Sequence, residues 1–325
     1  MRARILAAVL TCCLAPAASQ AAPADTYPDR PIRLIVPYAA GGGVDLLARK
    51  FAEALGSQMG QSVFVENKVG AGGTLGAVSV SQARADGYTL LFGGSPMITN
   101  RLINPSVGVD VLKNLAPVSL INMNPFVLAV AGTAPYRSIQ DIVAAARQAP
   151  GKLNFASGGV GTGSHLAGAA LATTTGIDVV HVPYRGSVDL VPSLLGGQTQ
   201  FCFPVVTAAL PQVESGAVRV LGVTSAKRLP ILAGVPTLKE ALGSDDAVIE
   251  SWNGVWGPAG MPTDIVAKLN RAIHETFKRG ELNAFFDKNG SPVELSLTAD
   301  DFADFLAKET AKFSRIVRAS KIVQF

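Results

Sequence analysis

The sequence has 325 residues, 48% of them hydrophobic and 16% charged, which excludes an intrinsically disordered protein and allows two lobes with a core each. The formal net charge of +4 falls to +2 without Arg2 and Arg4 of the first 21 residues, so nucleic acid is not expected as the main partner. The later apolar runs are short and broken by Gly, Pro or charge, so no membrane-spanning helix is expected among them.

Residues 1–21 are expected to form a secretory signal that is removed. Arg2 and Arg4 supply a basic start and residues 5–15 an apolar stretch, and residues 19–21 place small side chains, Ser19 and Ala21, at the −3 and −1 positions of a cleavage site. Cleavage one residue later fits the pattern equally well. We therefore expect an exported protein located in a bacterial periplasm.

Two alternatives for this segment remain open, a membrane-retained anchor and a lipoprotein leader around Cys12 and Cys13. Thr11 argues against the lipoprotein because it stands where a small Gly or Ala is expected. Once the leader is removed, Cys202 is the remaining cysteine, so no intramolecular disulfide can form. Export without disulfides suits a periplasmic fold that is large enough to need no covalent cross-links.

In the first third of the chain, short apolar runs alternate with glycine-rich loops and amphipathic helices. The pattern predicts, in order, a strand over 32–36, a glycine loop over 39–44, a helix capped by Asp45, a strand over 63–65, a glycine turn over 66–73, a helix ending near 83, a strand over 88–92 and a loop over 93–96. Strands that alternate with helices predict an α/β fold with doubly wound, mainly parallel sheets. Ligands bind such sheets outside the carboxyl ends of the strands, where these glycine loops lie.

The rest of the chain predicts a second lobe and a return to the first. An apolar, extended run over 118–131 carries the chain out of the first lobe. The elements expected after it are a helix from Ser138, with Asp141 at capping-box spacing, that ends at 150–151, a strand, loop and helix over 154–174, a strand over 179–184, a helix over 189–195, strands over 201–203 and 218–223, a return crossing over 252–258, and helices after Pro262 and Thr298. Two lobes joined by two extended crossings form the hinged plan of periplasmic binding proteins.

Two glycine loops are expected to form the two halves of a carboxylate-binding site, because glycine lets the backbone approach a ligand and a helix start favours an anion. In the second loop the hydroxyls of Ser157, Thr162 and Ser164 are candidate donors, and ordinary turn and N-cap chemistry is the alternative. For the glycines of the first loop the alternative is a tight turn. The candidate ligand-binding residues are Tyr38, Ala40, Gly41, Gly42, Gly43, Ser95, Ser157, Gly161, Thr162, Gly163, Ser164, His165, Arg185 and Pro204.

Several of these candidates have a second interpretation. Ser95 follows a strand. It is expected either to line the first lobe's side of the cleft or to lie in the core of that lobe. Arg185 reaches the cleft or lies exposed in a turn, and His165 is expected beside the contacts or as a helix cap rather than on the ligand. His181 and His274 are expected to be structural or exposed. Three scattered histidines give no metal-ligand spacing, no nucleophile has a neighbouring base in the sequence, and no cofactor motif occurs, so neither an enzyme nor a cofactor is expected.

The order and spacing of several stretches carry a family resemblance. They are YPDRPIRLIVP (27–37), GG (41–42) with Asp45 and AR (48–49), ENK (66–68), GAGG (70–73), DGYTLL (86–91), NFAS (154–157), HLAG (165–168), HVPYRG (181–186), LLGGQ (194–198), VPT (235–237) and PAG (258–260). Together they resemble the Bug-type periplasmic substrate-binding proteins of tripartite tricarboxylate transporters, from Tyr27 almost to the C-terminus.

The resemblance implies a type II periplasmic binding fold that closes on a small carboxylate, held largely by backbone N–H groups, hydroxyls and waters. Two departures matter. Pro204 stands where the family usually has Asp, which removes a carboxylate and a backbone donor and predicts weaker recognition of an amino group. Ala40 stands where a Pro is common, which predicts a less rigid first loop.

We therefore expect a monomeric solute receptor that binds a mono-, di- or tricarboxylate and delivers it to membrane permease subunits. A periplasmic sensor input with the same ligands is the main alternative, and a secreted enzyme on this fold is the third. The expected segments are a signal over 1–21, lobe 1 over 22–122, lobe 2 over 123–250, and a return to lobe 1 over 251–325.

Overall fold

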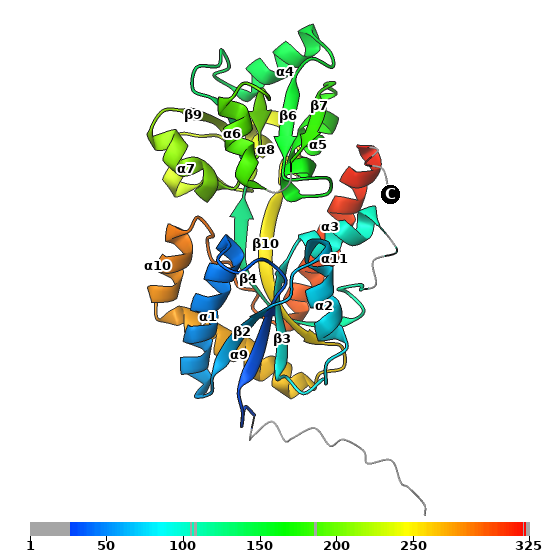
Figure 1. Ribbon diagram of the computed structural model, residues 1–325, viewed down its shortest axis with the longest axis vertical. Helices are drawn as coiled ribbons and strands as arrows, with labels where there is room; N and C mark the ends of the chain where they lie inside the picture. Colours follow the sequence, from blue (N-terminus) through cyan, green and yellow to red (C-terminus); the bar gives the residue numbers. More distant parts are fainter. Residues whose placement is uncertain (1–26, 105, 107–108, 185–186, 321, 323–325) are drawn as a thin grey trace, which may run out of the picture.

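The chain forms two lobes, one below the other in Figure 1, and each lobe is built on one five-stranded sheet. This confirms the expected two-lobe α/β fold. The expected signal segment lies outside the described residues. The computed structural model describes residues 27–104, 106, 109–184, 187–320 and 322.

Lobe 1, the lower lobe in Figure 1, has the strand order β2-β1-β3-β10-β4. Its strands are β1 (Ile32–Val36), β2 (Val63–Asn67), β3 (Thr89–Gly94), β4 (Leu115–Pro125) and β10 (Glu250–Pro258). Its helices are α1 (Gly43–Met59), α2 (Thr74–Ser81), α3 (Pro96–Ile103), α9 (Thr263–Lys278), α10 (Glu281–Lys288) and α11 (Ala299–Ala319).

Lobe 2 has the strand order β7-β6-β8-β5-β9. Its strands are β5 (Val127–Ala131), β6 (Asn154–Ser157), β7 (Val180–Pro183), β8 (Phe201–Cys202) and β9 (Val218–Val223). Its helices are α4 (Ile139–Gln148), α5 (Gly163–Thr175), α6 (Leu190–Leu195), α7 (Val206–Glu214) and α8 (Leu238–Leu242).

Both sheets are mixed rather than mainly parallel. In lobe 1, β1 runs parallel to β2 and β3, whereas β10 is antiparallel to β3 and β4. In lobe 2, β6 runs parallel to β7 and β8, whereas β5 is antiparallel to β8 and β9. β4 leads directly into β5 of lobe 2 and β10 brings the chain back to lobe 1, and these connecting strands take part in the antiparallel pairs. The parallel strands keep the expected strand–loop–helix order.

The two crossings between the lobes are hydrogen-bonded side by side. β4 continues through Phe126 into β5, and the backbone N–H of Phe126 donates to Thr224 Oγ1 at 2.9 Å. The N–H of Thr224 donates back to the carbonyl of Phe126 at 2.9 Å, and the N–H of Ile249 donates to the carbonyl of Thr224 at 3.1 Å. Thr224 is fully buried, so this junction forms a compact hinge.

The hydrophobic core of lobe 1 covers both faces of its sheet. On one face, α1, α9 and α10 bury residues such as Phe51 and Phe286. On the other face Trp252 and Trp256 of β10 are fully buried, and Phe302 of α11 packs against both rings at centroid distances of 6.2 and 5.0 Å. This second cluster continues into lobe 2, where it includes Leu166 of α5.

The structure corrects the expected loop over 93–96. Gly93 and Gly94 belong to β3, and a side chain at Gly94 would overlap the carbonyl oxygen of Trp252, so the glycine permits the close approach of β10. Ser95 and Pro96 then start α3, since proline is tolerated in the first turn of a helix. The sequence pattern also did not predict the short helices α7, α8 and α10.

None of the helices in the described part of the chain has both the length and the apolar character that crossing a membrane requires.

Candidate functional site

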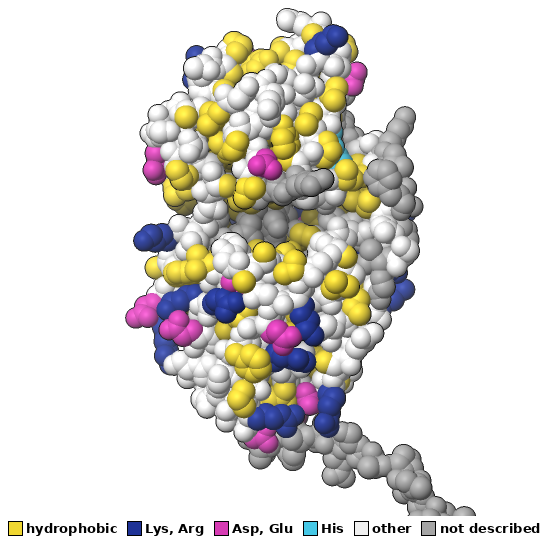
Figure 2. Space-filling view, viewed as in Figure 1, with side chains coloured by type: hydrophobic (Ala, Val, Ile, Leu, Met, Phe, Trp, Pro, Cys, Tyr) yellow, Lys and Arg dark blue, Asp and Glu magenta, His cyan; other side chains and the backbone are white. Residues whose placement is uncertain are grey.

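Two parallel strands, one in each lobe, lead into glycine-rich loops and then into helix starts. β1 leads to α1, and β6 leads to α5. Both loops lie on the sides of the lobes that face each other (Figure 1). The molecular surface narrows between the two lobes (Figure 2). The β6–α5 loop comes directly against lobe 1, because a methyl group at Gly161 would overlap the Cδ1 atom of Ile103 in α3.

In the β1–α1 loop, some backbone N–H groups donate hydrogen bonds to acceptors within the loop and the first turn of α1. The N–H of Gly41 donates to Asp45 Oδ2 at 2.8 Å, and that of Gly42 to the carbonyl of Ala39 at 3.2 Å. Gly41 has φ of 78°, which glycine adopts readily. Gly43 is the first residue of α1, and the N–H groups of a first turn have no acceptor within the helix. The donors that this loop offers to a ligand are therefore at the helix start.

Asp45 is not the helix cap that the sequence pattern predicts, because Gly42 occupies that position. Its carboxylate is 2% exposed and accepts from Arg49 Nε and Asn67 Nδ2, each at 2.8 Å. Burial raises its pKa, but the hydrogen bonds from Arg49, Asn67 and the Gly41 N–H outweigh burial, so the pKa is lowered. The Arg49 guanidinium balances this charge beside the loop.

Tyr38 and Ser95 are both turned into lobe 1. The Tyr38 hydroxyl is buried and has no hydrogen-bond partner among the described residues, and burial raises its pKa. Ser95 is 3% exposed; its Oγ lies 3.1 Å from Ser251 Oγ, and its N–H donates to the carbonyl of Trp252. The Ser95 hydroxyl therefore joins α3 to the hinge strand β10.

In the β6–α5 loop, the hydroxyls perform the turn and N-cap chemistry named as the alternative. Thr162 is the N-cap of α5: its Oγ1 accepts the N–H of His165 at 3.4 Å and donates to the carbonyl of Gly159 at 2.7 Å. Ser164 Oγ accepts the N–H of Gly158 at 3.0 Å and lies 3.0 Å from Thr162 Oγ1. These two hydroxyls shape the loop from within.

The backbone N–H groups of this loop are also largely committed. Four of them donate to acceptors of the same segment, namely those of Gly158, Gly159, Gly161 and Thr162. By contrast, the N–H groups of Gly163 and Ser164 at the start of α5 have no acceptor among the described residues. A helix start with unpaired N–H groups favours an anion, so the start of α5 is the candidate anion site of lobe 2, and the Gly161 N–H is occupied by His165.

Two histidines lie beneath this loop. His165 is 7% exposed, and its Nδ1 accepts the N–H of Gly161 at 3.1 Å. His181, which the sequence pattern left as structural or exposed, has its Nε2 at 2.5 Å from Ser157 Oγ. The pairing of β6 with β7, which aligns Phe155 with His181, brings these groups together, and no local sequence pattern reports it.

Pro204 is buried at the end of the segment that follows β8, and its carbonyl accepts the N–H of Val127 at 3.0 Å. It therefore lies beside the first residue of β5, next to the start of α7. Arg185 lies outside the described residues. No group of His, Cys, Asp or Glu in the described ranges could hold a metal ion.

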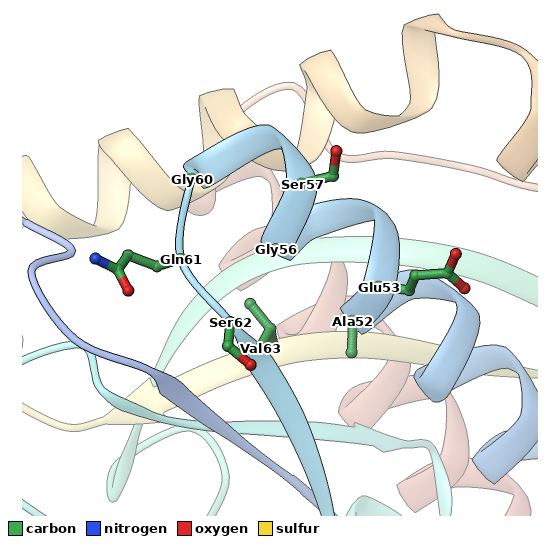
Figure 3. A pocket seen from close by; sticks show the side chains of 8 residues that line it. All are labelled: Ala52, Glu53, Gly56, Ser57, Gly60, Gln61, Ser62 and Val63. Atoms are coloured by element: carbon green, nitrogen blue, oxygen red, sulfur yellow. The ribbon is translucent and has the colours of Figure 1, made fainter.

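A pocket of about 360 Å³ lies at the opposite end of α1 from the glycine loop (Figure 3). It is open to solvent, and Glu53 is the one charged residue among its lining side chains. A carboxylate would meet a like charge there, so this pocket does not suit an anionic ligand.

Comparison with known proteins by sequence identifies a family. The model of the tripartite tricarboxylate transporter family receptor, TctC, matches residues 47–322. Protein BugT of Bordetella pertussis is 35% identical over 298 residues, which cover 91% of this chain and 90% of BugT. A UPF0065 protein from the tcbD–tcbE intergenic region of Pseudomonas sp. strain P51 is 34% identical over 317 residues, 97% of this chain and 94% of that protein.

Solved structures agree with the sequence comparison. R. palustris Rpa4515 with adipate matches with a TM-score of 0.79 and 31% identity, over 91% of this chain and 99% of that one. MatC (Rpa3494) from Rhodopseudomonas palustris with bound malate matches with a TM-score of 0.75 and 26% identity, over 90% and 100%. The chain therefore belongs to the TctC family of periplasmic substrate-binding receptors, which are binding proteins rather than enzymes.

Proposed function

We propose that this receptor binds a small carboxylate between its lobes, with the N–H groups at the starts of α1 and α5 as the main donors. The observation that carries the proposal is that each lobe offers one helix start with unpaired N–H groups toward the other lobe. Adipate and malate in two relatives support the ligand class.

The energies of such contacts are sufficient without a cationic side chain. A hydrogen bond to a charged group contributes about 1.5–3 kcal/mol, and a helix start adds about 0.3–1 kcal/mol. After the cost of ordering the ligand, three or four contacts support micromolar binding, which corresponds to about −8 kcal/mol.

Pro204 restricts the ligand class within this proposal. Proline has no N–H donor, and here it replaces a carboxylate that the family commonly has at this position. An ammonium group bound nearby would lose its charged partner, so we expect plain carboxylates to bind better than amino acids.

The bound ligand is then delivered to the membrane permease subunits of a tripartite tricarboxylate transporter, with the receptor acting as a monomer in the periplasm after the segment 1–21 is removed. The family name of the matching receptor model supports a transporter partner. Co-purification with permease subunits rather than with a sensor kinase would distinguish delivery from signalling.

A thermal-shift screen followed by calorimetry tests the ligand class. The panel contains adipate, malate, citrate and a short monocarboxylate, with aspartate and glutamate as the amino-acid counterparts. We expect at least one plain carboxylate to raise the melting temperature, because a ligand that binds the folded state stabilises it. If no carboxylate shifts the melting temperature, the proposal is wrong, and preferential binding of an amino acid would refute the role of Pro204.

A further inference from the structure

The imidazoles of His165 and His181 stack face to face beneath the β6–α5 loop. Their centroids are 3.8 Å apart, and their planes differ by 8°. Phe155 of β6 lies against His181 at 5.0 Å, and Phe201 of β8 lies against Phe155 at 5.6 Å. The rings therefore form a column between the core of lobe 2 and the loop. Gly168 keeps this column close to α5, since a side chain there would overlap Phe155.

Each imidazole is bonded to the loop through one nitrogen. His165 Nδ1 accepts the N–H of Gly161, so the ring is neutral with its proton on Nε2. His181 Nε2 meets Ser157 Oγ, and the same oxygen accepts the N–H of Gly159 at 3.1 Å. The pair thus holds the loop at two points on either side of its exposed tip.

The stacked rings stay uncharged at neutral pH. Burial, and then the repulsion that two protonated rings would exert on each other, lowers the pKa of His165 to about 3, and burial lowers the pKa of His181 to about 4. Each ring faces the other ring, the Phe155 ring and the loop, and no carboxylate or cation in the described part of the chain is paired with either. The histidines therefore do not attract the anion by charge.

We propose that His165 and His181 act as one neutral positioning unit for the carboxylate site. By binding the Gly161 N–H and the Ser157 hydroxyl, the unit holds the loop so that the N–H groups of Gly163 and Ser164 face the ligand. His165 is then a positioning residue that does not touch the ligand. This inference rests on the proposed function, because it concerns the same site.

The test compares His165→Asn with His165→Leu. An Asn oxygen stands close to the position of Nδ1 and can accept the Gly161 N–H, whereas Leu cannot. Both variants lose the ring stack, so both lose similar stability. We expect the Leu variant to bind the best carboxylate of the adipate, malate and citrate panel at least about tenfold more weakly, and the Asn variant to stay within about threefold of the wild type.

A matched control lies in lobe 1. His274 Nε2 bonds to the carbonyl of Ser296 at 2.9 Å, away from the cleft, so His274→Leu should lower stability without lowering affinity. The chemical shifts of backbone amides, measured by NMR, add a readout that a change in stability alone does not alter. In the wild type, ligand should shift the amide signals of Gly163 and Ser164 and leave the Gly161 amide bonded to His165.

The outcomes separate the inference from the proposed function. If the wild type binds a carboxylate and His165→Leu binds it equally well, the positioning role is wrong and the receptor function stands. A ligand that detaches the Gly161 amide from His165 and binds it directly also overturns the positioning role. If the wild type binds no carboxylate, both proposals fall.

Discussion

At the scale of single residues, the position of a glycine decides whether its N–H serves the loop or the ligand. Gly41 and Gly161 lie inside their loops at φ of 78° each, and both donate to side chains of the same segment. Gly43 and Gly163 are the first residues of α1 and α5, where the helix offers no acceptor. The proposed ligand donors and the residues that shape the loops are therefore glycines only two positions apart in the chain.

Gly43→Pro tests the helix start of lobe 1 by removing one N–H. Proline is favoured as the first helical residue, Gly42 before it is extended with φ of −74° and ψ of 165°, and no atom lies within 4 Å of an added Cβ at Gly43. We expect the melting temperature to stay near that of the wild type and carboxylate affinity, measured by calorimetry, to fall about 10- to 100-fold.

Gly43→Ala is the matched control, since it adds the same Cβ and keeps the N–H. Affinity within about threefold of the wild type is expected for this variant. Equal affinities of the proline and alanine variants would show that the Gly43 N–H is not a ligand donor.

At the scale of elements, β10 both completes the sheet of lobe 1 and forms one crossing of the hinge. Glu250, its first residue, faces charged groups from several segments. Burial raises its pKa to about 7, Glu294 and Glu309 raise it too, and Lys312 together with the N–H of Ala226 opposes them. Ala226 follows β9 of lobe 2, whereas Glu309 and Lys312 lie on α11 of lobe 1, so this carboxyl group sits where the lobes meet.

Glu250→Gln should change how stability depends on pH. The folded pKa of about 7 is above the ordinary value of 4.5, so the folded state keeps a proton that the unfolded state releases between these values. Wild-type stability therefore falls as pH rises from 4.5 to 7, and the variant lacks this loss. We expect Glu250→Gln to be more stable than the wild type at pH 8, by on the order of 1–3 kcal/mol, and equal to it near pH 4.5.

Urea unfolding at several pH values measures this difference. Glu214→Gln, at an exposed glutamate of α7, serves as the control and should follow the wild-type curve. A Glu250→Gln variant whose stability parallels the wild type across this pH range would contradict a raised Glu250 pKa.

At the scale of the whole molecule, α11 joins the lobes beside the crossing strand β10, since Trp252 Nε1 donates to Glu309 Oε2 of α11 at 3.1 Å. It packs on β10 in lobe 1 and reaches α5 of lobe 2 (Figure 1). Arg315 pairs with Asp246 of lobe 2 at 2.9 Å, and Ser320 Oγ lies 3.3 Å from Thr173 Oγ1. The Arg315–Asp246 pair is exposed and contributes little, so the shared apolar cluster is the main link.

This shared cluster predicts that both lobes unfold together. Trp252 and Trp256 report on lobe 1 by fluorescence, and Cys202, fully buried in β8, reports on lobe 2 by its reactivity with a thiol reagent. In protein without residues 1–21, we expect the fluorescence and thiol-labelling midpoints in urea to coincide. Labelling of Cys202 at a urea concentration where the fluorescence is still native would contradict a single cooperative unit.

Local sequence patterns predicted most of the helices and strands, and the order of short motifs along the chain indicated the protein family. Ser138 with Asp141 and Thr298 with Asp301 form the capping boxes that start α4 and α11, because capping depends on residues three apart. The glycine loops after β1 and β6 follow from short strands, glycines and helix signals that lie next to one another in the chain. Periodicity and order along the chain are sufficient for these features, and for the two-lobe fold.

The pairing of distant segments decided the rest. β10 enters the sheet of lobe 1 more than 150 residues after β3, which makes the sheet mixed and requires glycine at Gly94. The register of β6 on β7 stacks His181 on His165 and commits the N–H of Gly161. Sequence by itself therefore determined the two glycine loops and helix starts from which the proposed site is built. Which of their donors remain for a ligand was decided only by tertiary structure, because a hydrogen-bond partner is chosen by distance in space and not by distance along the chain.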